Sequence, residues 1–148
     1  MAVEQLVYAC AIAVVGLFTG GSLFISLVDV PARAALEPKV GREHFRQMYP
    51  RATAMQAPAA AGGSVLGWAL YLVSGSIPGL VTGAALGTVV VYTLAALMPI
   101  NRRLMDSGID LAPQEISELL SAWSKKHAAR TLLGGAAYLA LLSALVAP

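Results

Sequence analysis

Long uncharged, largely apolar stretches alternate with two short charged segments along this chain. The first stretch runs from Gln5 to Val28, and a second, from Ala52 to Asn101, contains no charged residue at all. At about 1.5 Å of rise per residue, a helix of about 20 residues crosses the ~30 Å hydrocarbon core of a bilayer. The first stretch therefore predicts one transmembrane helix, whereas the second is too long for a single crossing.

A turn divides the long uncharged stretch into two helices. Residues 74–79, Ser-Gly-Ser-Ile-Pro-Gly, combine the residue types that favour tight turns. A further apolar stretch lies near the end of the sequence. The sequence thus predicts one domain, residues 1–148, with four transmembrane helices over about 5–28, 52–73, 80–100 and 128–146.

Both charged segments contain the pattern of a short helix at the membrane surface. In the first, Pro31 and Pro38 are expected to break the helix, and residues 41–49 to form a short surface helix. In the second, Pro113 fits the first turn of an amphipathic helix that lies on the membrane and continues in frame into the fourth span. The predicted fold class is an all-α integral membrane protein, a four-helix bundle with short interfacial helices.

Composition agrees with a membrane location. Hydrophobic residues make up 57% of the chain and charged residues 12%, against roughly 25% charged in soluble domains. The basic residues form no tract suited to nucleic acid, so we expect no such partner.

The single cysteine, Cys10, cannot form an intrachain disulfide or supply a cysteine-rich metal site. The first five residues lack the basic character of a signal peptide.

The placement of charge predicts the orientation. All ten Lys and Arg residues lie in two segments, between the first and second spans and between the third and fourth. Four spans put these segments on the same side of the membrane. The positive-inside rule makes that side cytoplasmic, with both termini outside, in the cell (inner or plasma) membrane.

Glycines recur four residues apart, a spacing that lets helix backbones approach closely in lipid. The interpretation we favour is packing inside the bundle, and a homo-oligomer through these Gly-rich faces is the alternative. The residues concerned are Gly16, Gly20, Gly63, Gly67, Gly79, Gly83 and Gly87.

Polar residues gather near the cytoplasmic ends of the predicted spans, where four bundled helices bring them around one mouth. Trp123, His127 and Arg130 are spaced i, i+4, i+7 and so share one helix face. An imidazole, with its usual pKa near neutrality, suits a general base, and an arginine suits stabilisation of an oxyanion. Gln56, an amide inside an apolar span, is expected to face a partner. Interfacial anchoring by Trp and Tyr and topology signalling by Arg are the structural alternative.

Several short motifs occur in an order that is similar to a known family. They are Gly-Gly-Ser-Leu-Phe at 20–24, Pro-Ile-Asn-Arg-Arg-Leu at 99–104, and Trp123-x-x-x-His127-x-x-Arg130. With these motifs the chain resembles the anthrone oxygenase-like membrane family. The resemblance implies a four-helix membrane protein and, as in characterised fungal members, oxidation of a polyketide anthrone to an anthraquinone by molecular oxygen. Matching positions make Asn101, Trp123, His127 and Arg130 the candidate functional set.

We therefore predict a small membrane oxidoreductase that oxidises a hydrophobic, anthrone-like aromatic molecule with molecular oxygen. An anthrone is a flat carbon acid whose anion reacts with oxygen, so the reaction needs a base, a donor and a dry pocket, and requires no cofactor. The expected catalytic residues are His127, Arg130 and Asn101; the expected substrate-binding residues are Trp123, Tyr49, Arg51 and Gln56.

Two other functions fit the sequence. One is a non-catalytic membrane scaffold or partner subunit that docks through its Gly-rich faces. The other is a haem- or metal-binding electron-transfer bundle that uses His44 and His127. The spacing of potential ligands requires no metal site.

Overall fold

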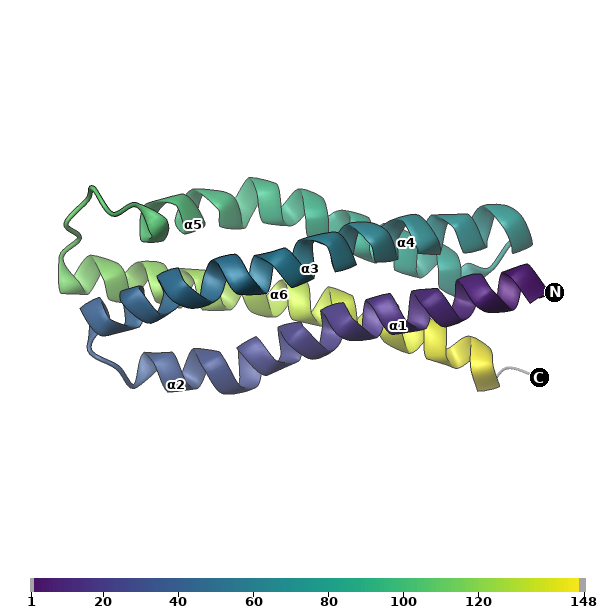
Figure 1. The fold of residues 1–148 in the computed structure, drawn as a ribbon, viewed down its shortest axis with the longest axis horizontal. Coiled ribbons are helices and arrows are strands. Elements are labelled where there is room, and N and C mark those ends of the chain that lie inside the picture. Colours follow the sequence, from purple (N-terminus) through teal and green to yellow (C-terminus); the bar gives the residue numbers. More distant parts are fainter. Residues whose placement is uncertain (1, 147–148) are drawn as a thin grey trace.

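Four long helical rods lie side by side along the molecule (Figure 1). The computed structural model describes residues 2–146, and all of its regular structure is helical. Each rod is long and apolar enough to cross a membrane, so the predicted fold class is confirmed and the chain is a multi-pass membrane protein. The rods are α1 (Ala2–Phe24) with η1 (Ile25–Asp29) and α2 (Val30–Ala34); α3 (Pro38–Ser74); α4 (Ile77–Tyr92) with η2 (Thr93–Leu97) and α5 (Met98–Met105); and α6 (Pro113–Val146).

The predicted surface helix at residues 41–49 is wrong as a separate element, whereas the helix that begins at Pro113 continues into the fourth span, as its frame predicted. Residues 41–49 are the first turns of α3, and residues 113–127 are the first half of α6. Each helix begins on a proline, Pro38 or Pro113, and no turn sequence follows before the apolar span. These first turns also have partners to pack on, because Phe45 of α3 and Trp123 of α6 meet edge to face at 5.2 Å. The four-helix arrangement therefore continues beyond the apolar region.

Pro31 does not break the first rod, contrary to the sequence expectation. A proline lacks an N–H and its ring crowds the carbonyl four residues before it. The backbone accommodates this with a π-helical turn just upstream, where the N–H of Val30 bonds to the carbonyl of Ile25. The third rod has a similar π-helical turn just before Pro99, where the N–H of Met98 bonds to the carbonyl of Thr93. Single π-helical turns of this kind are frequent at functional sites.

The predicted turn between α3 and α4 is confirmed. Gly75 ends α3 with φ of +70°, a left-handed conformation that favours glycine. The hydroxyl of Ser76 then caps α4 by accepting from the N–H of Gly79 at 3.1 Å. The result is a tight antiparallel hairpin.

Close to this turn, α3 and α4 approach backbone to backbone. A Cβ atom on Gly67 would lie 2.4 Å from the nitrogen of Gly83 and 2.9 Å from the carbonyl oxygen of Gly79. We call Gly67, Gly79 and Gly83 the glycine contact. These glycines are used for packing inside the bundle, as the favoured interpretation expected.

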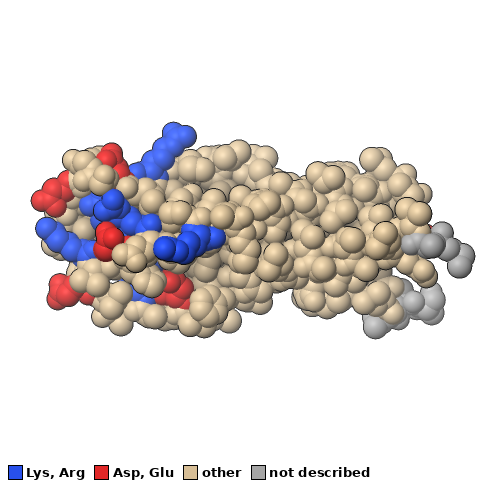
Figure 2. Space-filling view, in the orientation of Figure 1, with Lys and Arg blue, Asp and Glu red and all other residues tan. Residues whose placement is uncertain are grey.

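Charged residues gather at one end of the molecule. Figure 2 shows Lys, Arg, Asp and Glu at the end that carries the α2–α3 and α5–α6 connections, whereas the rest of the visible face is almost free of charge. Both basic segments therefore lie at the same end of the bundle, as the count of spans required. A buried apolar cluster lies beneath this charged end and includes Ile25, Phe45, Leu97, Leu104 and Trp123.

Candidate functional site

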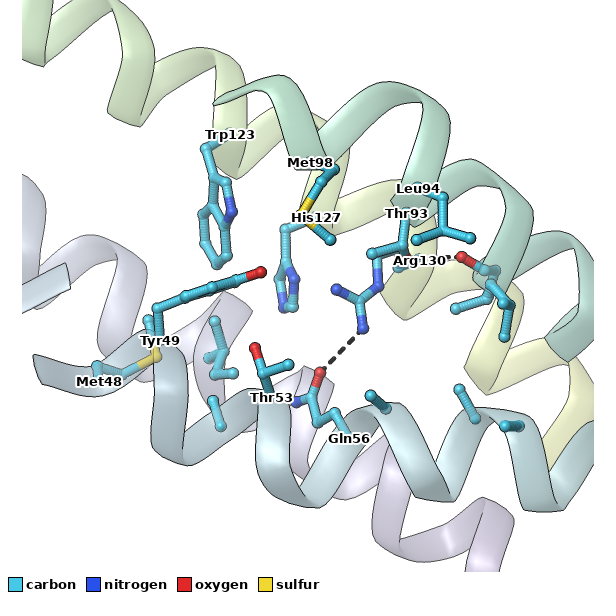
Figure 3. A pocket seen from close by; sticks show the side chains of 17 residues that line it. Met48, Tyr49, Thr53, Gln56, Thr93, Leu94, Met98, Trp123, His127 and Arg130 are labelled. Carbon is cyan, nitrogen blue, oxygen red and sulfur yellow. Dashed lines mark hydrogen bonds between the residues drawn. The ribbon is translucent and has the colours of Figure 1, made fainter. Parts of the chain in front are cut away.

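An apolar cavity of about 310 Å³ lies inside the bundle, between α3, the α4–η2–α5 rod and α6 (Figure 3). Ala52, Ala60 and Val89 are typical of its walls, and Ile25 of η1 and Leu94 of η2 bring both π-helical turns to it. Its volume is at the lower end of the range of small-molecule sites, about 300–1,000 Å³. The polar lining residues are Tyr49, Thr53, Gln56, Thr93, Trp123, His127 and Arg130.

The three residues that share a face of α6 all line this cavity, as their spacing predicted. The rings of Trp123 and His127 stack in parallel, with centroids 4.7 Å apart and planes 8° apart. Trp123 is buried, and His127 is only 1% exposed. Arg130 follows one turn further along α6 and points toward α3 in Figure 3. Stacking on the indole fixes the plane of the imidazole.

The imidazole of His127 keeps one nitrogen for a ligand. Its Nε2 lies 3.4 Å from the carbonyl oxygen of Ser22 on α1. A carbonyl can only accept a hydrogen bond, so this contact assigns the proton of the neutral ring to Nε2. The buried Nδ1 has no hydrogen-bond partner among the described residues. Its lone pair is therefore left without a hydrogen-bond donor there.

Among the described residues, Arg130 is the only charged one that lines the cavity, and no acidic residue pairs with it. Its Nη2 donates to the side-chain carbonyl of Gln56 at 3.1 Å, and its guanidinium lies 5.6 Å from the ring centroid of Phe18. Within residues 2–146, no carboxylate forms a salt bridge with it. Arg130 Nε and Gln56 Nε2 also have no hydrogen-bond partner in the described chain. The cavity thus contains an uncompensated cation and several free donors.

Asn101 lies behind the cavity wall rather than in it. Its amide nitrogen donates to the hydroxyl of Tyr49 at 3.0 Å, and its amide oxygen accepts from the indole N–H of Trp123 at 2.8 Å. It is buried and is not among the lining residues. Asn101 therefore joins α3, α5 and α6 and holds two residues that do line the cavity. Because the Tyr49 oxygen accepts from Asn101, its own hydrogen is free to be donated to a ligand.

Arg51 is also outside the cavity, contrary to the sequence expectation. It is exposed, and its Nη1 donates to the carbonyl of Gln47 on its own helix. Consecutive helical residues are rotated by about 100°, so Arg51 points roughly opposite to Tyr49, two residues earlier. It lines a separate groove between α1 and α3. The structure therefore brings together Tyr49, Gln56, Trp123, His127 and Arg130, and leaves out Arg51 and Asn101.

Sequence reasoning missed a buried ion pair, Asp29–Arg33, that packs against Trp123 of the site. Arg33 is 3% exposed, and its Nη1 lies 3.1 Å from Oδ2 of Asp29, whose Oδ1 lies 2.7 Å from Nε2 of His44. The Arg33 guanidinium also lies 5.0 Å from the ring centroid of Trp123. Asp29 and Arg33 are four residues apart at the end of an apolar span, which is the signal that could have revealed the pair.

The two histidines have different surroundings. His44 is about half exposed and bonds to Asp29, while His127 is buried in the cavity wall. Among residues 2–146, no three His, Cys, Asp or Glu side chains come together as a metal site of such ligands requires. The donor set of the cavity, a single imidazole beside a guanidinium, suits a small organic ligand.

The fold and the site define a class of protein: a four-helix membrane bundle with an internal apolar pocket that is lined in part by a histidine and by an arginine with no acidic partner among the described residues. Residues 45–140 match the sequence model of the anthrone oxygenase family, and the chain belongs to this family. The matched region contains Tyr49, Gln56, Trp123, His127 and Arg130 and confirms the resemblance found in the sequence. No curated protein and no solved structure matches the chain.

Proposed function

We propose that this protein oxidises a flat, hydrophobic aromatic molecule of the anthrone type with molecular oxygen. The observation that carries the proposal is the guanidinium of Arg130, which has no acidic partner among residues 2–146 and lines the same apolar pocket as His127, whose Nδ1 is unpaired there. A buried charge is costly unless an opposite charge meets it. The pocket therefore favours a ligand that carries, or develops, negative charge next to a base.

The size and shape of the pocket fit such a molecule. A cavity of about 150 Å³ takes up benzene, and a three-ring aromatic is roughly twice as large as benzene. The observed cavity of about 310 Å³ agrees with that size. The parallel rings of Trp123 and His127 add a flat wall on one side. Few polar groups line the remainder, so a polar molecule of equal volume would lose more hydration than it could recover.

The first step is removal of a proton from the central methylene of the anthrone by Nδ1 of His127. The negative charge that remains on the substrate is delocalised onto its ketone oxygen, across the central ring. Arg130 is the residue that stabilises this oxyanion, and Tyr49 has a hydrogen free to support it. Stabilisation of this kind is strong because water is excluded from the pocket. Gln56 holds the guanidinium through the 3.1 Å hydrogen bond.

Oxygen then completes the reaction. The methylene carbon forms a bond to one atom of O₂, and the proton held by His127 passes to the other atom to give a hydroperoxide. Loss of the second C–H proton breaks the O–O bond and leaves a carbonyl. In total CH₂ and O₂ become C=O and H₂O: the carbon loses four electrons, and O₂ gains four. The balance is complete without another oxidant.

The direct test is anthraquinone formation from a simple anthrone by proteoliposomes that contain the purified protein. Empty liposomes run in parallel, because anthrones oxidise slowly in air. His127→Ala is expected to lower kcat by about 10²–10⁴-fold, as removal of a general base does. Arg130→Met is expected to lower it by about 10²–10³-fold, as removal of an oxyanion donor does.

The chain offers a matched control for each variant. His44→Ala removes the other histidine, and Arg51→Met removes an arginine that the structure places outside the pocket. Both controls are expected to retain turnover. A parent rate equal to that of empty liposomes refutes the proposed function, and equal losses in His44→Ala and His127→Ala refute the role of His127.

The orientation of the bundle belongs to the same proposal. The basic residues at one end favour a cytoplasmic location for the α2–α3 and α5–α6 connections, with both termini outside, in the cell membrane. A single cysteine at the exposed position Ser107, in a Cys10→Ala background, tests this. A membrane-impermeant maleimide should label it in inverted vesicles but not in intact cells. Labelling in intact cells reverses the proposed orientation.

A further inference from the structure

We propose that the substrate enters this pocket sideways from the hydrocarbon of the bilayer, through an opening between α3 and the α4–η2 segment. Thr53, Ala57 and Ala61 form the α3 side of this lateral opening, and Val90 and Leu94 form the other side. The identity of the substrate rests on the proposed function. The route itself rests on two observations: which residues of the cavity lining are exposed on the surface of the bundle, and which residues are buried at its charged end.

Some residues that line the cavity are exposed on the outside of the bundle. Ala57 and Ala61 are exposed, and Leu94 is 61% exposed, yet all three line the cavity. A residue with both properties marks a place where a cavity reaches the molecular surface. Figure 3 looks into the cavity between α3 and the α4–η2 segment, with Leu94 and Thr53 on opposite sides.

This opening lies at the depth of the lipid chains. Ala57 comes six residues after Arg51, and Leu94 comes eight residues before Arg102. At about 1.5 Å per residue, these positions are roughly 9 and 12 Å farther into the span than those charged residues. No charged residue lies between Ala52 and Asn101, so both sides of the opening belong to the apolar region. A molecule that passes through it comes from hydrocarbon.

The opposite route, from water at the charged end, is blocked by packed side chains. Phe45 has no exposed surface, and Trp123 and Asn101 are each 3% exposed. The hydrogen bonds from Asn101 to Tyr49 and from Trp123 to Asn101 join three helices across this end. A polar molecule approaching from water would have to break both.

A second set of hydrogen bonds holds the charged end of the bundle closed. Arg42 of α3 donates through Nε to the carbonyl of Leu104 and through Nη1 to that of Ile109, each at 3.0 Å, and through Nη2 to the carbonyl of Asp106. One side chain thereby fastens the end of α5 and the following loop to α3. Opening at this end would break all three bonds together with the Asn101 network.

The same helices explain why the lateral side is open. The glycine contact holds α3 and α4 together close to their connecting turn. Farther along, the facing α3 positions Ala57 and Ala61 have the smallest side chains after glycine, and η2 replaces regular α-helix at Leu94. Rotation of the Leu94 side chain is enough to widen the opening, since such rotamer changes are fast and need no movement of helices.

A lateral opening restricts the class of substrate. Molecules that dissolve in the bilayer, such as unconjugated aromatic ketones and phenols, reach the site at high local concentration. Derivatives that carry a sugar or a phosphate stay at the water interface and are excluded. The product quinone is also apolar and leaves by the same path.

The test measures access to Trp123 and needs no turnover. In a Trp68→Phe background, Trp123 is the single tryptophan of the chain. We expect bromobenzene dissolved in the liposomes to quench its fluorescence efficiently, and aqueous acrylamide to quench it weakly. The double variant Ala57→Phe/Ala61→Phe should reduce the bromobenzene quenching slope at least threefold. Ala54→Phe is the matched control, because Ala54 is an exposed alanine of α3 that does not line the cavity.

A variant in the opposite direction guards against a folding artefact. Leu94→Ala should increase the bromobenzene slope, which loss of structure in a filled variant cannot imitate. Equal slopes in the double variant and Ala54→Phe, or acrylamide quenching as strong as that by bromobenzene, overturn the lateral route. Reduced quenching in the double variant together with no anthrone turnover by the parent supports the route and refutes only the proposed function.

Discussion

The glycine contact between α3 and α4 gives a sharp prediction about stability. Gly67→Ala places a Cβ atom 2.4 Å from the nitrogen of Gly83 and 2.8 Å from its Cα. Both neighbouring atoms are backbone, so no side chain can rotate away. The two helices must separate by about 1 Å to restore ordinary contact. Overpacking of this kind costs about 1–3 kcal/mol.

A loss of this size is measurable by thermal unfolding in mild detergent. For a chain of this length, each kcal/mol changes Tm by about 2–4 °C, so Gly67→Ala should unfold roughly 2–12 °C below the parent. Gly20→Ala is the matched control, because a Cβ atom on Gly20 meets nothing within 4 Å. It should unfold at or above the parent temperature, since alanine favours helix by up to about 1 kcal/mol over glycine. Equal Tm values for the two variants would refute the backbone contact.

The remaining predictions concern residues that support the site without lining it. Asn101→Leu leaves the buried indole N–H of Trp123 unpaired, at a cost of about 1–3 kcal/mol, so Tm should fall and KM rise while part of kcat is retained. Loss of turnover as complete as in His127→Ala, at unchanged Tm, would contradict this supporting role. Arg33→Met removes the guanidinium from the buried Asp29 carboxylate and leaves it only the half-exposed His44 as a partner, so it should cost up to about 3–5 kcal/mol, measured as Tm, whereas Lys39→Met, which breaks an exposed ion pair, should cost less than about 1 kcal/mol. Similar losses of Tm in these two variants would show that the Asp29–Arg33 pair contributes no more to stability than an exposed ion pair.

Part of the site could be predicted because it depends on one helix. Trp123, His127 and Arg130 share a face of α6 at any bundle geometry, since their spacing alone fixes their direction. Arg51 was assigned wrongly because a cluster at one depth says nothing of rotation about the helix axis, and α3 turns this residue away from Tyr49. Asn101 was placed at the correct depth, but only the packing of α5 against α3 and α6 shows that its amide serves Tyr49 and Trp123.

The sequence by itself determined the four apolar spans, the turn after Ser74 and the shared side of the charged segments. These follow from the bilayer, which imposes length and charge rules on each segment independently. Tertiary structure decided the properties that need two or more helices: the lone cation in the pocket, the ion pair at Asp29 and the lateral opening at Leu94. Whether a polar atom has a partner, and whether a cavity meets lipid or water, depends on how the faces of neighbouring helices meet, and no single segment carries that information.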